Sequence, residues 1–155
     1  MPHAVAVEDP DQPDIRAKLA EADAFYASLY PAEFNYLLDI GSLKAPGVTF
    51  LVARAAEGGL LGFGAVVMQE DGWAEIKRMY VDPAARGQGV GRAVLTALEA
   101  HARAQGAWRA RLETGNKQPP ALGLYRAFGY VECGPFGGYA DDPVSIFMAR
   151  ELGDG

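Results

Sequence analysis

Three apolar runs of strand length follow one another in the middle of the chain, with only a few turn residues between them. They cover Val48 to Arg54, Leu60 to Gln69 and Trp73 to Val81, and both gaps contain glycine. Apolar runs of this length, joined by short glycine turns, are typical of β-hairpins. The pattern predicts an antiparallel meander of three strands.

A glycine-rich segment and a helix follow the third strand. Apolar residues from Val90 to Ala102 recur at helical spacing, and Gly106 supplies a left-handed cap. The next run, Ala107 to Thr114, alternates in polarity and is predicted to be a strand. A strand-helix-strand crossover makes it parallel to the strand that ends at Val81. Its alternation places Trp108, Ala110 and Leu112 on one face and Arg109, Arg111 and Glu113 on the other.

The rest of the chain adds elements of both kinds, so the predicted class is α/β with a single mixed sheet. One domain of residues 1–155 is expected, because domains average about 150 residues. The further predicted elements are an edge strand at Ala4 to Val7, helices at Pro13 to Leu29, Ala32 to Asp39 and Ala121 to Phe128, and strands at Tyr130 to Gly134 and Val144 to Leu152.

Charge and composition exclude several classes of function. The 14 basic and 20 acidic side chains give a net charge of −6, whereas binders of nucleic acid or anionic membranes carry a basic footprint. One cysteine and two histidines are too few for a Cys/His zinc site. An acidic start without an apolar signal segment favours a cytoplasmic location. No apolar run is long enough for a transmembrane helix.

The strongest chemical signal is the segment Arg86-Gly87-Gln88-Gly89-Val90-Gly91-Arg92, between a strand and a helix. Glycines let the backbone approach a ligand, and the free amides at a helix start favour an anion such as phosphate. A Rossmann fingerprint would need glycine at position 92, and a P-loop would need Gly-Lys-Ser or Gly-Lys-Thr. The alternative is a turn that only starts the helix.

The pattern R-x-x-G-x-G after this strand resembles the acetyl-CoA pyrophosphate loop of the GNAT acetyltransferases. The similarity extends from about Trp73 to Tyr130. It implies the GNAT fold, a mostly antiparallel sheet flanked by helices, with parallel central strands that splay at the acetyl-CoA site. The tail containing Asp142-Pro143 and Ser145 resembles a bacterial subgroup of uncharacterised acetyltransferases.

The resemblance implies acetyl-CoA as co-substrate and no metal. Backbone groups at the end of the third meander strand would bind the pantetheine arm. Gln118 occupies the position where many members have asparagine, and its side chain carries the same amide. The implied cofactor-binding residues are Met79, Tyr80, Val81, Arg86, Gly87, Gln88, Gly89, Val90, Gly91, Arg92, Gln118 and Tyr125.

Two residues are candidates for proton transfer. Tyr125 matches the family tyrosine near the CoA sulfur, and its alternative role is packing within its helix. Glu75 resembles the glutamate that some members use as a base through water. Glu75 could equally form an ion pair with a neighbouring base on the sheet. Lys77 and Arg78 are adjacent, so they are expected on opposite faces of the strand.

The acceptor site is expected against the early helices and the late loop. The candidates by resemblance, each with packing or solvated surface as its alternative role, are Tyr30, Glu33, Phe34, Asn35 and Tyr139. Cys133 lacks a histidine partner for nucleophilic catalysis, and it and His101 are interpreted as structural.

The predicted function is transfer of an acetyl group from acetyl-CoA to a small amine-bearing acceptor in a ternary complex. Two alternatives stay open: a non-catalytic acyl-CoA-binding or sensor domain, and an O-acyltransferase or an enzyme for longer acyl chains. No nucleic-acid or membrane partner is expected. A homodimer stays open.

Overall fold

The computed structural model describes residues 4–32, 39–137 and 139–153. They form one seven-stranded sheet in the order β1-β2-β3-β4-β5-β7-β6. The β4–β5 pair is parallel and the other neighbouring pairs are antiparallel, which confirms the predicted mixed sheet. The strands are β1 (Ala4–Val7), β2 (Val48–Arg54), β3 (Leu60–Met68), β4 (Trp73–Val81), β5 (Arg109–Gly115), β6 (Val131–Cys133) and β7 (Ser145–Glu151).

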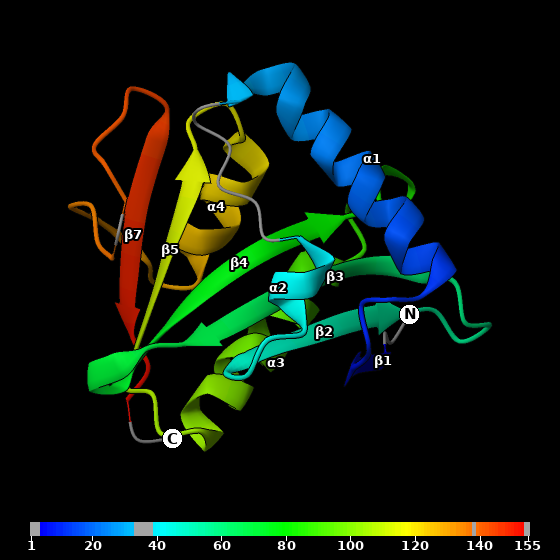
Figure 1. Ribbon diagram of the computed structural model, residues 1–155, viewed down its shortest axis with the longest axis horizontal. Helices are drawn as coiled ribbons and strands as arrows, with labels where there is room; N and C mark the ends of the chain where they lie inside the picture. The colour runs from blue at the N-terminus through cyan, green and yellow to red at the C-terminus, as the bar shows by residue number, and fades with distance from the viewer. Residues whose placement is uncertain (1–3, 33–38, 138, 154–155) are drawn as a thin grey trace.

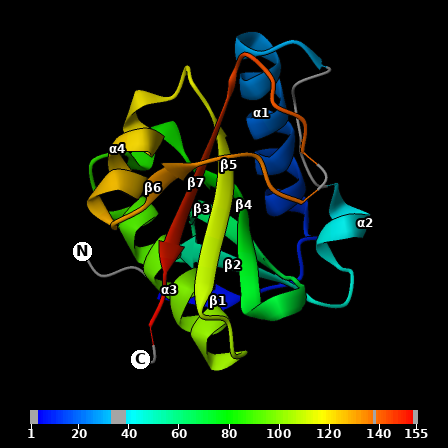
Figure 2. The ribbon, with the colours of Figure 1, turned by 90° about the vertical axis from the view of Figure 1, so that its left-hand side faces the viewer.

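Helices cover both faces of the sheet (Figures 1 and 2). They are α1 (Pro13–Leu29), α2 (Ile40–Leu43), α3 (Val90–Ala104) and α4 (Pro119–Ala127), with short 3-10 turns at Glu70–Gly72 and Pro83–Ala85. The predicted helix from Ala32 to Asp39 falls largely on residues 33–38, outside the described residues. No helix within the described residues is long and apolar enough to cross a membrane.

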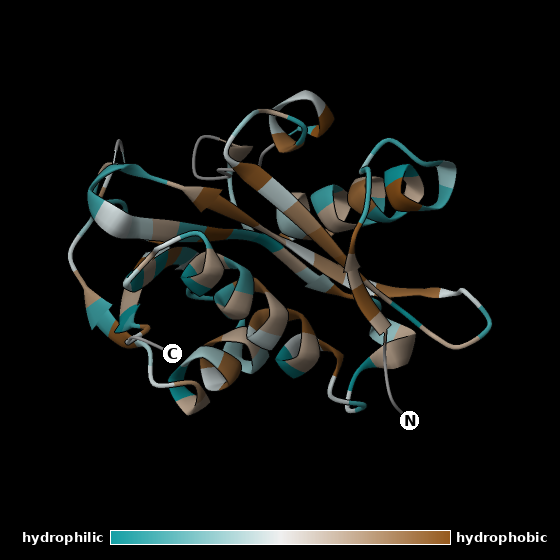
Figure 3. Cartoon of the chain, turned by 90° about the horizontal axis from the view of Figure 1, so that it is seen from below, coloured by the Kyte–Doolittle hydropathy of each residue, from teal (hydrophilic) through white to brown (hydrophobic). Residues whose placement is uncertain are grey.

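Helices lie on both sides of the sheet in Figure 3, and an apolar core lies on each face. The α1-side core joins buried residues of α1, such as Ile15 and Leu19, to Phe50 of β2. The α3-side core joins Val94 and Leu98 of α3 to the opposite face of the sheet. Successive side chains along a strand point alternately into these two cores, because neighbouring residues of a strand face opposite sides of the sheet.

A β-bulge in β4 interrupts this alternation. Lys77 and Tyr80 pair with β3 residues that are two apart, so β4 carries one extra residue at this point, and Arg78 has φ 60°. The extra residue reverses the facing of the residues after it. Ile76 therefore packs in the α3-side core, whereas Tyr80 packs in the α1-side core.

The same bulge corrects the prediction that Lys77 and Arg78 occupy opposite faces. Lys77 pairs with Glu75, which lies on the strand face opposite Ile76, and Arg78 forms a 2.7 Å ion pair with Asp23 of α1. Both side chains thus have their charge partners on the α1 side of the sheet. Simple alternation fails because Arg78 adopts the left-handed conformation, in which the backbone turns out of the regular pleat.

The parallel strands β4 and β5 separate towards their carboxyl ends. They pair from Trp73 to Ile76 and from Arg109 to Leu112, although β4 continues to Val81 and β5 to Gly115. Figure 1 shows the two strands diverging, with α4 beside the opening. The carboxyl ends of parallel strands are where ligands bind in open α/β sheets, so the divergence marks a site.

Trp108 is the exception to the predicted faces of the fifth strand. It precedes β5 and is 48% exposed, whereas Ala110 and Leu112 are buried as predicted. Its indole Nε1 donates to the Asp71 carbonyl oxygen at 3.1 Å, and the ring lies against Gly72. Trp108 therefore packs on the turn before β4 instead of continuing the buried face.

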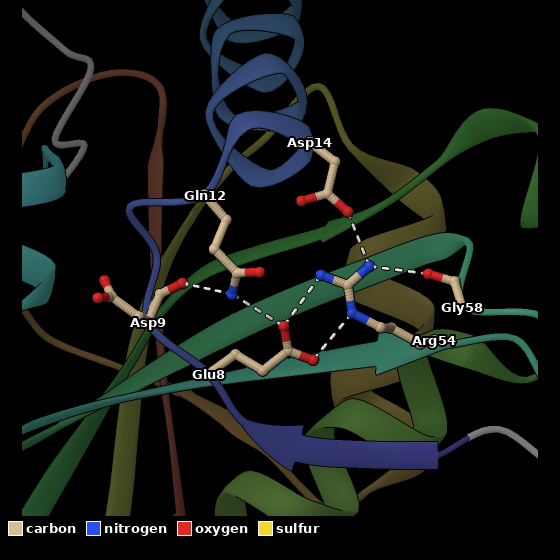
Figure 4. A network of polar contacts seen from close by, with 6 residues as sticks. All are labelled: Glu8, Asp9, Gln12, Asp14, Arg54 and Gly58. Atoms are coloured by element: carbon tan, nitrogen blue, oxygen red, sulfur yellow. Dashed lines mark hydrogen bonds and ion pairs between the residues drawn. The ribbon is translucent and has the colours of Figure 1, made fainter.

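A network around Arg54 holds the start of α1 to the edge of the sheet (Figure 4). The guanidinium donates from Nε and Nη2 to the two Glu8 oxygens at 2.9 Å, and from Nη1 to Asp14 at 2.7 Å and to the Gly58 carbonyl. The hydrogen bonds from Arg54 lower the pKa of Glu8 and of Asp14. This paired geometry is specific to arginine, so α1 is anchored where it crosses towards the cavity.

Candidate active site

A cavity of about 710 Å³ opens where β4 and β5 diverge. Its walls come from α1, the end of β4, the glycine loop, the start of α3, the end of β5 and α4. Helix α1 supplies Tyr26, whose hydroxyl donates to the Met79 carbonyl oxygen at 2.9 Å, and burial raises the pKa of Tyr26 to about 12. Tyr26 was not among the residues predicted from sequence. The cavity therefore joins segments that are distant along the chain.

The glycine loop forms one end of this cavity. Gly87 and Gly89 have φ of 81° and 79°, a region that favours glycine, and Gly89 is the residue before the first turn of α3. A Cβ on either glycine would meet no atom of the described residues within 4 Å. The loop therefore needs glycine for its backbone conformation and leaves open space beside the N-terminus of α3, where an anion is favoured.

Most of the predicted cofactor residues lie together in the cavity wall. Gln88 does not line it, and its amide lies 3.5 Å from the Ala84 carbonyl oxygen. Within the described residues, neither Arg86 nor Arg92 forms an ion pair, and Arg92 instead lies over the Phe128 ring. The lining members are Met79, Tyr80, Val81, Arg86, Gly87, Gly89, Val90, Gly91, Arg92, Gln118 and Tyr125.

Tyr125 projects from α4 into the wall between the two diverging strands. It is 5% exposed, and its ring packs edge-on against Tyr130 at 5.9 Å between centroids. Burial, followed by the charges of Tyr26 and Glu113, raises the pKa of Tyr125. Its hydroxyl makes no hydrogen bond within the described residues. The phenol therefore stays protonated and can donate to a group in the cavity.

Glu75 lies beside the cavity and not in its lining. Its carboxylate accepts a hydrogen bond from the Tyr139 hydroxyl at 2.5 Å and pairs with Lys77 at 3.4 Å. Lys77 also donates to the Tyr139 hydroxyl and does line the cavity. The three side chains form a closed polar cluster, in which the ion pair runs along β4.

Glu113 is the carboxylate in the cavity wall, and it was not singled out from sequence. Burial raises the pKa of its carboxyl, against the opposing effects of the Ser145 hydrogen bond and the Lys77 charge. Ser145 Oγ lies 2.7 Å from Glu113 Oε2. The sequence feature that could have indicated Glu113 is an acidic residue near the end of an alternating strand. Its contact with Ser145 arises only because β5 pairs with β7.

The predicted acceptor residues divide into three groups. Tyr30 lines the cavity, and Tyr139 lies next to it through Lys77. Glu33, Phe34 and Asn35 lie outside the described residues.

The two remaining candidates lie away from the cavity. Cys133 is exposed on β6. His101 on α3 has its ring Nε2 2.9 Å from the Thr49 hydroxyl, a contact between α3 and β2. Among the described residues no cluster of three metal-ligating side chains occurs.

Comparison with known proteins places the chain in a family. The model of the acetyltransferase (GNAT) family matches residues 15–130, and the chain belongs to that family. It is 44% identical to an IAA acetyltransferase of Azospirillum brasilense over 149 residues, 96% of this chain and 97% of the relative.

Solved structures agree. A Klebsiella pneumoniae protein described as an acyl-CoA N-acyltransferase superposes with a TM-score of 0.82 at 35% identity, over 97% of both chains. A phosphinothricin acetyltransferase of Sinorhizobium meliloti in complex with AcCoA shares the fold, with a TM-score of 0.71 at 21% identity, over 100% of this chain and 91% of that one. GNAT homologues thus bind acetyl-CoA as co-substrate.

Proposed function

We propose that the protein is a cytoplasmic N-acetyltransferase whose single domain, residues 1–155, transfers the acetyl group of acetyl-CoA directly to a small amine in a ternary complex. One observation carries the proposal. The glycine loop with Arg86 and Arg92 opens into the same cavity as Tyr125 and Glu113. A candidate anion site and two candidate proton-transfer groups thus line one cavity.

The cavity suits both substrates. The amides at the start of α3 and the two loop arginines would hold the pyrophosphate. The pantetheine arm would run along Met79 to Val81 towards Tyr125. The volume of about 710 Å³ lies within the range of small-molecule sites, and the amine would bind next to the acetyl group, towards the α1 residues of the wall.

Acetyl transfer to an amine needs a donor for the departing thiolate and an acceptor for the amine proton. Tyr125 is the proposed donor, because it lines the cavity and burial raises its pKa, so that it keeps its proton at working pH. The Glu113 carboxyl group is best placed to accept the amine proton, since it lines the cavity. The role of Glu75 as a base stays a prediction beside its ion pair with Lys77.

An acyl-CoA sensor would need the loop but not the proton-transfer groups, and Tyr125 favours the enzyme. We would follow thiol release from acetyl-CoA against a panel of amines, amino acids and peptides. Release that depends on one class of amine supports the proposal, and calorimetric binding of acetyl-CoA with no release from any acceptor would favour the sensor. Products that hydroxylamine cleaves would indicate O-acetylation, and a matched propionyl-CoA series would test longer acyl groups.

A further inference from the structure

One hydroxyl lies between two carboxyl groups at the edge of the cavity. Ser145 Oγ is 2.7 Å from Glu113 Oε2 and 2.8 Å from Asp142 Oδ2. Both distances are those of strong O–H···O hydrogen bonds. A serine hydroxyl has a single proton to donate. It can therefore donate to one carboxyl only, and the second contact needs a proton from the other carboxyl group.

The three side chains consequently hold two protons, one on the hydroxyl and one on a carboxyl. Burial raises the pKa of Glu113, which favours Glu113 as the protonated member. The charged groups around it are Lys77 and Glu75 on β4 and Asp142 before β7, with the phenol of Tyr125 on α4. Two of these are acids against one lysine, so the surroundings do not force Glu113 to ionise.

The chain of groups connects the cavity to the outside. Glu113 lines the cavity, and Asp142 is partly exposed in the loop that leads into β7. The Asp142 Oδ1 atom accepts the backbone amides of Val144 and Ser145 at 2.9 and 2.7 Å, which fixes Oδ2 towards the serine hydroxyl. Within the described residues, Glu113 Oε1 makes no hydrogen bond. It is the atom left to receive a proton from the cavity.

We propose that Glu113, Ser145 and Asp142 form a proton relay that carries the proton of the acceptor amine from the cavity to solvent. In one concerted step, the amine N–H bond breaks and its proton joins Glu113 Oε1 while Glu113 Oε2 gives up the proton that it holds. The proton on Glu113 Oε2 passes to Ser145 Oγ, and the hydroxyl proton passes to Asp142 Oδ2 and then to water. One proton leaves the cavity, and no electron changes hands. The relay rests on the proposed function. Ser145 and Asp142 act through Glu113 and are positioning residues.

Kinetics with substitutions test the relay. Ser145→Ala removes the bridging hydroxyl, Ser145→Thr keeps it, and Asp142→Asn keeps the acceptor for the two amides but removes the carboxyl. Asp141→Asn is the matched control, because Asp141 is its exposed neighbour. We expect kcat to fall on the order of 100-fold in Ser145→Ala and Asp142→Asn, with unchanged calorimetric affinity for acetyl-CoA. The Thr variant should recover the rate, and the control should match the parent.

A merely structural role would not predict rescue by small proton carriers. If the relay is broken, added imidazole or formate should raise kcat of Ser145→Ala in proportion to its concentration. The relay would be overturned if Ser145→Ala kept the kcat of the parent, its pH profile and its solvent isotope effect, which is the ratio of kcat in H₂O to kcat in D₂O. A loss that neither threonine nor added buffer recovers would also overturn it.

An infrared measurement keeps the test independent of the acceptor. The parent at neutral pH should show the C=O band of a protonated carboxyl, and Glu113→Gln should lose it. Absence of that band in the parent would overturn the relay even in an active enzyme. A band that is present in a protein that acetylates nothing would support the shared proton and count against the proposed function alone.

Discussion

The Tyr30 hydroxyl accepts a hydrogen bond from the Lys117 amide at 3.0 Å and thereby joins the end of α1 to the loop between β5 and α4. The side-chain Nε2 of Gln118 lies 3.3 Å from the same Tyr30 oxygen. A Cβ on Gly115 would stand 1.9 Å from it. Glycine at position 115 therefore leaves space for the Tyr30 ring in the cavity wall, where Tyr30 contacts Lys117, 87 residues further along the chain.

Tyr30→Phe should lose about 1 to 2 kcal/mol of unfolding free energy, because a partly buried amide loses its acceptor. Gly115→Ala should have a larger effect, since the new methyl group displaces the Tyr30 ring. Thermal unfolding gives both values, and calorimetry should show weaker acetyl-CoA binding in both. Parent-like stability of Gly115→Ala would contradict the close contact.

Tyr125→Phe should lower kcat by roughly 10² to 10⁴, the usual effect of a positioned proton donor, with unchanged affinity for acetyl-CoA. Tyr130→Phe is the matched control. Its phenol packs against the same ring but donates to Glu99 at 2.8 Å, away from the cavity. The control should lose stability and keep kcat. Equal turnover in Tyr125→Phe and parent, measured where chemistry limits the rate, would remove Tyr125 from the mechanism.

Gly89→Ala should weaken acetyl-CoA binding in calorimetry, because its backbone must leave φ 79° or accept a strain of about 1 to 2 kcal/mol. Gly106→Ala provides the control at the other end of α3. Gly106 also has a positive φ, and a Cβ there also meets nothing within 4 Å in the described part of the chain. Both variants should lose similar stability, and only Gly89→Ala should lose affinity. Equal affinities would place the pyrophosphate elsewhere.

Glu75→Gln and Glu113→Gln separate the two carboxylates by their pH dependence. If Glu113 accepts the proton, Glu113→Gln should be slow near neutral pH and recover at high pH, where the free amine needs no base. Glu75→Gln should then keep the parent profile but lose about 3 kcal/mol of stability, because Glu75 is buried and its ion-pair partner Lys77 keeps its charge. The measurement is kcat/KM over about pH 6 to 10. The opposite pattern would assign the base to Glu75.

Glu113 and the Arg54 network with Glu8 and Asp14 contribute to the stability of the fold with opposite dependences on pH. The pKa of Glu113 is raised by burial, so its contribution is present at low pH and is lost as pH rises through that pKa. The pKa values of Glu8 and Asp14 are lowered by Arg54, so their contribution is lost as pH falls through them. Arg54→Met should cost roughly 1 kcal/mol near neutral pH, since these groups are partly exposed. The difference from the parent should shrink in acid, as denaturant unfolding at several pH values can show.

Much of the fold follows from local patterns in the sequence. The helix Pro13–Leu29 and the strands Val48–Arg54 and Trp73–Val81 have the predicted bounds, because apolar spacing, proline and glycine act on neighbouring residues and need no tertiary context. The glycine loop is a local signal of the same kind, since glycine permits the positive φ that Gly87 and Gly89 adopt.

Tertiary structure decided which side chains meet. Periodicity assigns Lys77 and Arg78 to opposite faces, but the bulge forms only when β4 pairs with β3, and it reverses the facing of Tyr80. Trp108 likewise left the predicted face because the turn at Asp71 offers it a partner. Alternation gives the face of a residue only in a regular strand.

The candidate proton-transfer groups show the same division. Tyr125 and Gln118 were found from sequence because they belong to one short motif. Glu113 and Ser145 are 32 residues apart, and only the β5–β7 pairing sets their oxygens 2.7 Å apart. Burial then raises the pKa of Glu113, an effect of the whole surrounding structure. The sequence alone thus determined the conformation of the glycine loop, while packing decided which acidic side chain lines the cavity.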